Sequence, residues 1–116
     1  MTHIKRVLVV EDEALIAMSI EQSLTDLGYE VVGPYHNLQD GLDHSSRQET
    51  DFALLDFDLG NGTNSLPIVE RLSASGTPYA FVTGSSPDYI RRFLPRARIL
   101  GKPMNDDVLR KALAAA

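Results

Sequence analysis

The sequence contains no cysteine, so disulfide bonds, thiolate metal sites and a cysteine nucleophile are all excluded. It also lacks a hydrophobic run long enough to cross a membrane, and the few apolar residues before Glu11 are too short a stretch for a signal peptide. We therefore expect a cytoplasmic protein with no membrane insertion.

Positive charge is scarce in this chain. There are 16 acidic residues against 11 lysines and arginines, which gives a net charge of -5 at pH 7. This excess of negative charge disfavours direct binding to the phosphate backbone of a nucleic acid. Arginine gathers at Arg91, Arg92, Arg96 and Arg98, which we interpret as a solvated face of the protein.

The length and the hydrophobic content predict one globular domain. A chain of 116 residues is long enough for one domain with its own core and too short for two. Hydrophobic residues make up 43% and charged residues 23%, which is ordinary for a globular protein and argues against disorder. We expect residues 1–116 to form this single domain.

Short apolar runs alternate with segments of helical periodicity, and the alternation repeats about five times. The runs are residues 6–10, 30–33, 52–55, 79–82 and 97–100. In the first helical segment, apolar residues recur near helical spacing before Gly28, at Leu15, Met18, Ile20, Leu24 and Leu27. Later helices are predicted to begin near Asn37, Ser65, Ser86-Pro87 and Met104 or Asn105. The helix that begins at Ser86-Pro87 is predicted to run through Phe93 and to end at Pro95. The pattern predicts an α/β fold with a parallel sheet and crossover helices.

Polar residues follow four of the predicted strands. They are Glu11-Asp12-Glu13 after the first, Asp56-Phe57-Asp58 after the third, Thr83 after the fourth and Lys102 after the fifth. Each has an ordinary explanation when taken alone, such as helix capping for Glu11 and Asp12 or a surface position for Lys102. The carboxyl ends of parallel strands, however, share one edge of the sheet, and ligands bind at that edge. We therefore expect these side chains to meet.

Carboxylates that meet at one edge repel one another unless a cation compensates their charge. Oxygen ligands without histidine or cysteine favour Mg²⁺. The hydroxyl of Thr83 can donate to an oxyanion, and Lys102 supplies a positive charge opposite the acids. Because an aspartate can attack a phosphoryl group and form an acyl phosphate, we predict phosphoryl transfer to Asp56.

The order Glu11-Asp12, Asp56, Thr83 and Lys102-Pro103 resembles the receiver domains of two-component response regulators, over essentially all 116 positions. This resemblance implies a flavodoxin-like (βα)5 three-layer sandwich with a parallel sheet in the order 2-1-3-4-5. It implies that Asp56 is the phosphoacceptor, and that Mg²⁺ is held by Asp12, Asp56 and the backbone carbonyl of Asp58, with Glu11 acting through water. It also implies that Thr83 hydrogen-bonds the phosphoryl group, that Lys102 pairs with it, and that the Lys102–Pro103 bond is cis.

The same resemblance implies the partners. A sensor histidine kinase or a histidine phosphotransfer protein would be the donor, and a downstream protein would be the target; a homodimer stays open. The chain would be a signalling phosphoacceptor, with only self-catalysed phosphotransfer and autodephosphorylation. Residues 78–84 resemble the FAT GUY group of single-domain regulators, so we expect no output domain. Two positions depart from the family pattern: Glu11 stands where aspartate is usual, and Ile99 where a switch aromatic is usual, so Phe81 or Tyr89 is an alternative switch.

Two other functions stay open on sequence grounds. A protein-binding module of this fold could signal without phosphate, for which Glu11 and Ile99 are hints. The segment 54–58 also resembles the opening of haloacid-dehalogenase-type phosphatases, with Asp56 as nucleophile and Asp58 as general acid. Such enzymes need a later acidic metal motif after a strand, whereas Asp106-Asp107 is predicted to start a helix.

Overall fold

The computed structural model describes residues 4–45, 50–102 and 104–115. Five strands form one parallel sheet in the order β2-β1-β3-β6-β7. They are β1 (Arg6–Val10), β2 (Glu30–Tyr35), β3 (Phe52–Leu55), β6 (Tyr79–Thr83) and β7 (Ile99–Gly101). The helices are α1 (Ala14–Asp26), α2 (Leu38–Ser45), α3 (Leu66–Ala74), α4 (Pro87–Arg91) and α5 (Asp106–Ala114). This confirms the predicted flavodoxin-like order, since β6 and β7 are the fourth and fifth strands of the sheet.

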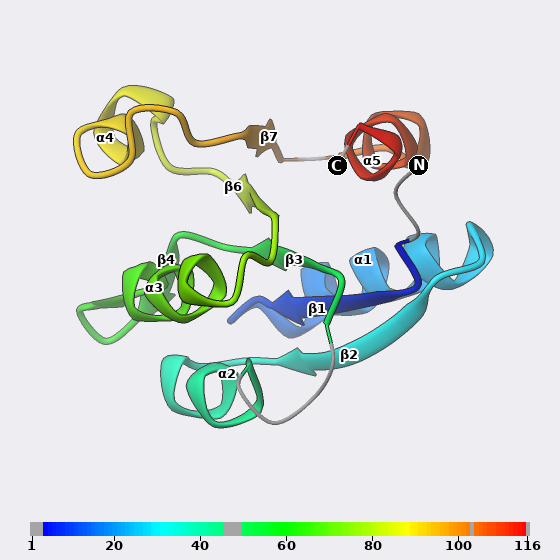
Figure 1. Ribbon diagram of the computed structural model, residues 1–116, viewed down its shortest axis with the longest axis horizontal. Coiled ribbons are helices and arrows are strands. Elements are labelled where there is room, and N and C mark those ends of the chain that lie inside the picture. The colour runs from blue at the N-terminus through cyan, green and yellow to red at the C-terminus, as the bar shows by residue number, and fades with distance from the viewer. Residues whose placement is uncertain (1–3, 46–49, 103, 116) are drawn as a thin grey trace.

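The helices cover both faces of the sheet, with α1 and α5 on one side and α2, α3 and α4 on the other (Figure 1). Alternate residues of β1 enter two different cores, because successive side chains of a strand point to opposite faces. Val7 and Val9 join the core beneath α1 and α5, and Leu8 and Val10 join the one beneath α2, α3 and α4. Burial on both faces explains why the β1 segment shows no polar alternation.

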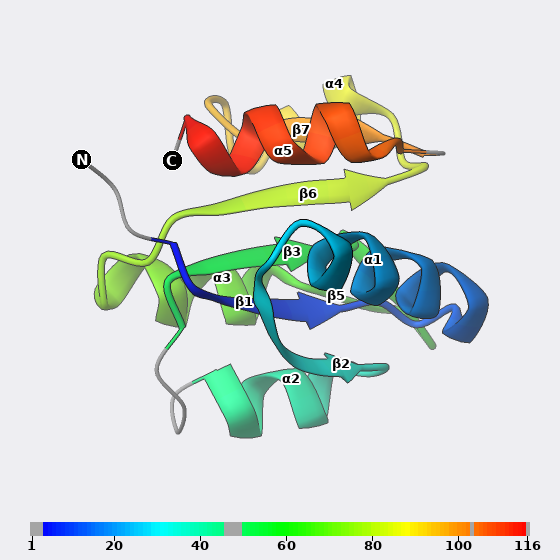
Figure 2. The same ribbon diagram turned by 90° about the vertical axis from the view of Figure 1, so that its right-hand side faces the viewer.

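The register of the strands brings the polar residues that follow them to one edge. Val10 pairs with Leu55 across β1 and β3, so the residues that follow both strands leave the sheet at the same level. Thr83 pairs with Gly101 across β6 and β7, directly before Lys102. The arrowheads of β1, β3 and β6 point toward this same edge (Figure 2). The predicted convergence at the carboxyl edge is therefore confirmed.

A small antiparallel sheet that the sequence did not predict lies between β3 and α3. It consists of β4 (Asp58–Gly60) and β5 (Thr63–Asn64). The intervening turn needs three consecutive residues with positive φ, at Gly60 (83°), Asn61 (53°) and Gly62 (74°). Glycine and asparagine tolerate this conformation, so the Gly-Asn-Gly sequence can close the hairpin.

The predicted apolar face of α1 was partly wrong. The buried residues of this helix are Ala17, Ile20 and Leu24, whereas Leu15 is 81% exposed and Met18 is 61% exposed. An α-helix turns by roughly 100° per residue, so Leu15 lies roughly 200° around the helix from Ala17, on the opposite side. Two large apolar side chains therefore face outward.

The predicted helix starts had mixed outcomes. Asn37 and Asn105 are N-caps, since their side-chain oxygens accept from the amides of Asp40 (2.8 Å) and Val108 (2.9 Å). Ser65 and Ser86 occupy the N-cap positions of α3 and α4, and Pro87 is the first residue of α4, as predicted, but neither serine makes a capping side-chain hydrogen bond.

The segment between α4 and β7 also differs from the prediction. The helix α4 ends at Arg91 and is followed by turns, with the amide of Phe93 donating to the carbonyl of Ile90 at 3.0 Å. The last strand begins at Ile99 instead of residue 97. The predicted cis bond before Pro103 lies outside the described residues. No helix in the described part of the chain is long and apolar enough to cross a membrane.

Candidate functional site

Asp56 stands at the end of β3 with both carboxylate oxygens engaged. Its amide donates to the carbonyl of Val10 at 2.9 Å, which fixes the residue against β1. The hydroxyl of Thr83 donates to Oδ1 at 2.8 Å, and Nζ of Lys102 lies 2.9 Å from Oδ2. Asp56 and Thr83 are buried, and the side chain of Lys102 is mostly buried. Side chains from three separate strand ends thus meet at one carboxyl group.

Lys102 also contacts Glu11. Its Nζ lies 2.6 Å from Oε1 of Glu11, a side chain that is only 1% exposed. The other oxygen of Glu11 accepts from the amide of Glu13 at 3.1 Å. The ammonium is therefore shared between two carboxylates. The direct contact with Glu11 could not be predicted from spacing, because the direction of that side chain depends on tertiary packing.

Burial perturbs the ionisation of this pair. Removal from water raises the pKa of Glu11 to about 7, although Lys102 and the amide of Glu13 act to lower it. Burial works to lower the pKa of Lys102, but the hydrogen bonds and charges of Glu11 and Asp56 outweigh it and raise that pKa. Lys102 therefore stays a cation at neutral pH, while Glu11 exchanges a proton near neutrality.

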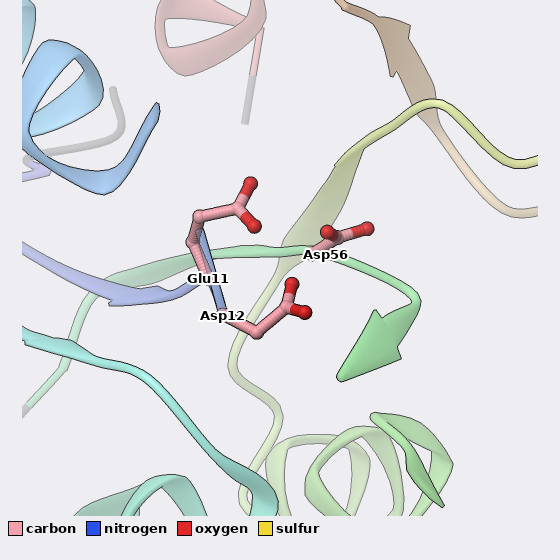
Figure 3. A group of neighbouring side chains, drawn as sticks. All are labelled: Glu11, Asp12 and Asp56. Carbon is pink, nitrogen blue, oxygen red and sulfur yellow. The ribbon is translucent and has the colours of Figure 1, made fainter. Parts of the chain in front are cut away.

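Three carboxyl groups form an acidic cluster at this edge. One oxygen each from Glu11, Asp12 and Asp56 lies within 4.8 Å of the others (Figure 3). Asp12 is exposed, whereas the other two side chains are buried. The donors are all carboxylate oxygens, with no histidine or cysteine, and this donor set fits Mg²⁺. One ammonium does not neutralise three carboxylates, so a divalent cation also suits the charge of the site.

A pocket of about 290 Å³ opens beside the acidic cluster. Its lining comes from the loops after β1, β3, β6 and β7, and consists of Asp12, Glu13, Asp56, Asp58, Gly60, Thr83, Gly84, Ser85 and Lys102. The amide of Ser85 donates to the hydroxyl oxygen of Thr83 at 3.2 Å, which orients that hydroxyl. Asp58 is exposed, and its side chain accepts from the amide of Gly60 at 3.1 Å. The pocket gives a phosphoryl-sized group access to Asp56.

Phe57 connects this site to α4. It follows Asp56 directly and is buried, with its ring centroid 5.6 Å from that of Phe81. Its ring also packs edge-on against Tyr89 at 5.8 Å and lies 6.0 Å from that of Phe93. We call Phe57, Phe81, Tyr89 and Phe93 the aromatic cluster. Sequence analysis considered Phe81 and Tyr89 but missed Phe57, whose position in a loop after a strand gave no sign of a packing role.

Comparison with solved structures finds similar proteins. The solution structure of SdrG from Sphingomonas melonis Fr1 is 39% identical, with a TM-score of 0.84 over 99% of this chain and 98% of that one. The solution structure of the BeF3-activated conformation of SdrG from Pseudomonas melonis Fr1 is 36% identical, with a TM-score of 0.82 and the same coverage. The crystal structure of the response regulator PhyR from Brucella abortus is 29% identical, with a TM-score of 0.84 over 99% of this chain and 48% of that one.

Comparison with curated proteins gives no match. The family model of the response regulator receiver domain, however, matches residues 7–114. That match covers nearly the whole chain and includes both edge strands of the five-stranded sheet, β2 and β7. This protein therefore belongs to the response regulator receiver domain family of two-component signalling.

Proposed function

We propose that this receiver domain accepts a phosphoryl group on Asp56 from a phosphohistidine, and that phosphorylation changes its affinity for a downstream protein. The donor would be a histidine kinase or a histidine phosphotransfer protein. The observation that carries the proposal is the geometry at Asp56, whose two oxygens lie within hydrogen-bond distance of the hydroxyl of Thr83 and the ammonium of Lys102.

The proposed transfer uses these residues directly. A carboxylate oxygen of Asp56 attacks phosphorus, the new O–P bond forms as the P–N bond to the donor histidine breaks, and the imidazole leaves. Lys102 and Thr83 already contact the carboxylate, so both are near the phosphoryl oxygens once the acyl phosphate forms. Their contacts with those oxygens would draw the loops after β6 and β7 toward Asp56.

We further propose that Asp12, Asp56 and the backbone carbonyl of Asp58 hold Mg²⁺, with Glu11 acting through water. When bound, this ion neutralises charge on the transferring phosphoryl group. The acidic cluster supports this assignment. Glu11 has a second role in the proposal, because its contact with Lys102 at 2.6 Å holds the ammonium beside Asp56.

The outward side of α1 suits the donor protein. We define the α1 face as Leu15, Met18 and the adjoining pocket of about 390 Å³, which is lined by Leu15, Ile16, Ser19, Ile20, Ser23, Val82, Lys102, Met104 and Asn105. Lys102 lines both this pocket and the one at Asp56. A protein that buries Leu15 and Met18 would therefore bring its histidine near the phosphoacceptor.

The side of α4 suits the downstream protein. We define the α4 face as Tyr89, Arg92, Phe93, Leu94 and Arg96. Tyr89 and Phe93 contact Phe57, the residue after Asp56, whereas the usual switch position holds Ile99. We propose that Tyr89, through Phe57, takes the switch role and that phosphorylation shifts this face between two states.

The direct test is incubation with acetyl phosphate and Mg²⁺, followed by mass measurement of the intact protein. We expect a gain of one phosphoryl group that Asp56→Asn abolishes and that Asp26→Asn, an exposed aspartate on α1, leaves unchanged. Failure of the folded protein to gain mass would overturn the proposal and favour a phosphate-independent binding module. Sustained turnover of p-nitrophenyl phosphate would favour the phosphatase instead.

A further inference from the structure

The end of β2 holds the main chain of Glu11 on both sides. The amide of Glu11 donates to the carbonyl of Tyr35 at 2.9 Å, and Nδ1 of His36 lies 3.0 Å from the carbonyl oxygen of Glu11. A carbonyl oxygen can only accept a hydrogen bond, so Nδ1 of His36 carries the proton in this contact and is the donor. Two consecutive residues, Tyr35 and His36, thus fix both peptide groups of Glu11.

An irregularity in β2 brings these two residues to Glu11. Val10 pairs with Tyr35, whereas the register of the preceding pairs would set Val10 opposite Pro34, which has no amide hydrogen. The extra residue is accommodated at Gly33, whose φ is 102° and where a Cβ atom would come 2.8 Å from the amide nitrogen of Tyr35. This bulge therefore places the last residue of β2, and the histidine that follows it, beside Glu11.

The carbonyl that His36 contacts belongs to the peptide unit that leads into Asp12. This unit is planar, so a hydrogen bond to its oxygen also fixes the direction of the amide and of the Cα atom of Asp12. Glu11 and Asp12 leave neighbouring points of one loop and extend toward Asp56 (Figure 3). Asp12 is the exposed member of the acidic cluster. Because little packing holds an exposed side chain, the place of its carboxylate depends on the main chain that carries it.

We propose that His36 is a positioning residue for the divalent cation, because its hydrogen bond to the carbonyl of Glu11 holds Asp12 where the acidic cluster can bind Mg²⁺. The inference rests on the proposed assignment of Mg²⁺ to Asp12 and Asp56. His36 is not a metal ligand in this proposal, since it acts through the main chain of Glu11. Outer partners of this kind orient the groups that bind a metal, and their loss weakens metal binding without abolishing it.

A second histidine of the chain provides a matched control. Nδ1 of His44 lies 2.9 Å from the carbonyl oxygen of Asp40, within α2. This contact has the same chemistry as that of His36, but its acceptor leads to no carboxyl group of the acidic cluster. A purely structural role for both histidines predicts that neither substitution changes the affinity for Mg²⁺. The positioning role predicts that only a change at His36 does.

The test is an amide NMR titration of the intact protein with Mg²⁺, in the absence of any phosphoryl donor. His36→Phe keeps a ring but removes the donor, and it should raise the dissociation constant for Mg²⁺ by about twofold to tenfold, the range of one hydrogen bond in net free energy. His44→Phe keeps the ring that stacks on Tyr35 and should leave the dissociation constant unchanged. Because His36 is exposed, its substitution removes no core contact.

Two further measurements separate positioning from a general loss of stability. His36→Asn places an amide donor near the position of Nδ1, so it should recover most of the affinity for Mg²⁺ that His36→Phe loses. In the metal-free protein, the amide signal of Asp12 should move in His36→Phe and return toward its wild-type position in His36→Asn. With acetyl phosphate, His36→Phe should need more Mg²⁺ for half the maximal labelling rate, while the rate at saturating Mg²⁺ stays that of the wild type.

Several outcomes would overturn the role of His36. These are an unchanged dissociation constant in His36→Phe, an equal rise in His44→Phe, or a His36→Asn variant that binds Mg²⁺ no better than His36→Phe does. A wild type without Mg²⁺-induced shifts at Asp12 and Asp56 would remove the metal site and this role together. If His36→Phe weakens Mg²⁺ binding but acetyl phosphate adds no mass to the wild type, the positioning role stands and the phosphorylation of Asp56 fails. If mass is gained and His36→Phe binds Mg²⁺ as the wild type does, the reverse holds.

Discussion

The α1 face and the α4 face both expose large apolar side chains, but they are built differently. The α1 face presents two flexible aliphatic side chains, Leu15 and Met18, beside a pocket that Lys102 shares with the phosphorylation site. The α4 face presents two aromatic rings among arginines, and these rings contact the buried ring of Phe57, the residue after Asp56. The α1 face therefore lies next to the pocket at Asp56, whereas the α4 face is connected to Asp56 through the packing of Phe57.

This difference separates the two proposed partners. A donor has to bring its phosphohistidine within bonding distance of Asp56, so it needs a surface next to the pocket, and adaptable side chains such as methionine suit a docking surface of that kind. A target has only to distinguish two states of the protein, so it can bind at a distance. We propose that the buried ring of Phe57 transmits the change, because it follows Asp56 and contacts Tyr89 and Phe93, and packed contacts are not continuously deformable.

Lys102→Ala should have the largest effect, because Lys102 lines the pocket of the α1 face and also contacts Asp56. It leaves the buried carboxylates of Glu11 and Asp56 without their ammonium, and breaking a buried pair costs about 3 to 5 kcal/mol of stability. Urea unfolding should show this loss in the absence of Mg²⁺ and a partial recovery on its addition. Lys111→Ala, an exposed lysine on α5, is the control and should be nearly neutral. Measured above pH 7, where Glu11 is ionised, an unchanged stability for Lys102→Ala would contradict this role of the ammonium.

Phe57→Ala should remove the ring contacts that join the α4 face to the residue after Asp56. Truncation of a buried phenylalanine costs about 3 to 5 kcal/mol. The milder Phe57→Leu keeps an apolar side chain but removes the ring contacts to Tyr89 and Phe93. We expect acetyl phosphate to label Phe57→Leu as it labels the wild type. The changes in amide chemical shift that phosphorylation causes on the α4 face should become smaller. A full response on the α4 face in Phe57→Leu would show that the signal travels by another route.

Leu15→Ser combined with Met18→Ser should affect only the α1 face. Transfer from a phosphorylated histidine phosphotransfer protein should slow by roughly tenfold, because two apolar contacts with the donor are lost. Labelling by acetyl phosphate should not change, since a small donor needs no docking surface. Tyr89→Ser is the matched control and should leave both rates unaltered. Equal slowing by the two variants would remove the distinction between the faces.

The pH dependence of stability should show an effect that belongs to Glu11 alone. Burial raises the pKa of Glu11 from 4.5 to about 7, so between these values the folded protein holds a proton that the unfolded chain has released. The contribution of this carboxyl to the free energy of unfolding therefore falls as pH rises through that window. In the absence of Mg²⁺, Glu11→Gln should flatten this dependence in urea unfolding measured below pH 4.5 and above pH 7. A slope that persists in Glu11→Gln would assign it to another group.

The sheet could be predicted from the sequence because its signals are local and redundant. Residues 6–10 and 52–55 are continuous apolar runs, and they form β1 and β3 with the predicted bounds. The rule that parallel strands present their carboxyl ends at one edge then brought Asp12, Asp56, Thr83 and Lys102 to a common pocket without coordinates. The FAT GUY subgroup and the roles of these residues remain predictions.

What could not be predicted depends on the direction of single side chains. Leu15 and Met18 fit a helical period as well as buried residues do, and only the rotation of α1 on the sheet turned them outward. The contact of Glu11 with Lys102 and the packing of Phe57 likewise follow from tertiary structure and not from spacing. The small sheet of β4 and β5 was missed because its strands are shorter than any periodicity can reveal.

The most direct measurement is the amide NMR response to beryllium fluoride and Mg²⁺, a stand-in for the phosphoryl group, in the wild type and in Asp56→Asn. The account predicts that the wild type shifts both at Thr83 and Lys102 and at Tyr89 and Phe93 on the α4 face, and that Asp56→Asn shifts at neither. Shifts around Thr83 with a silent α4 face, or the same pattern in Asp56→Asn, would contradict it.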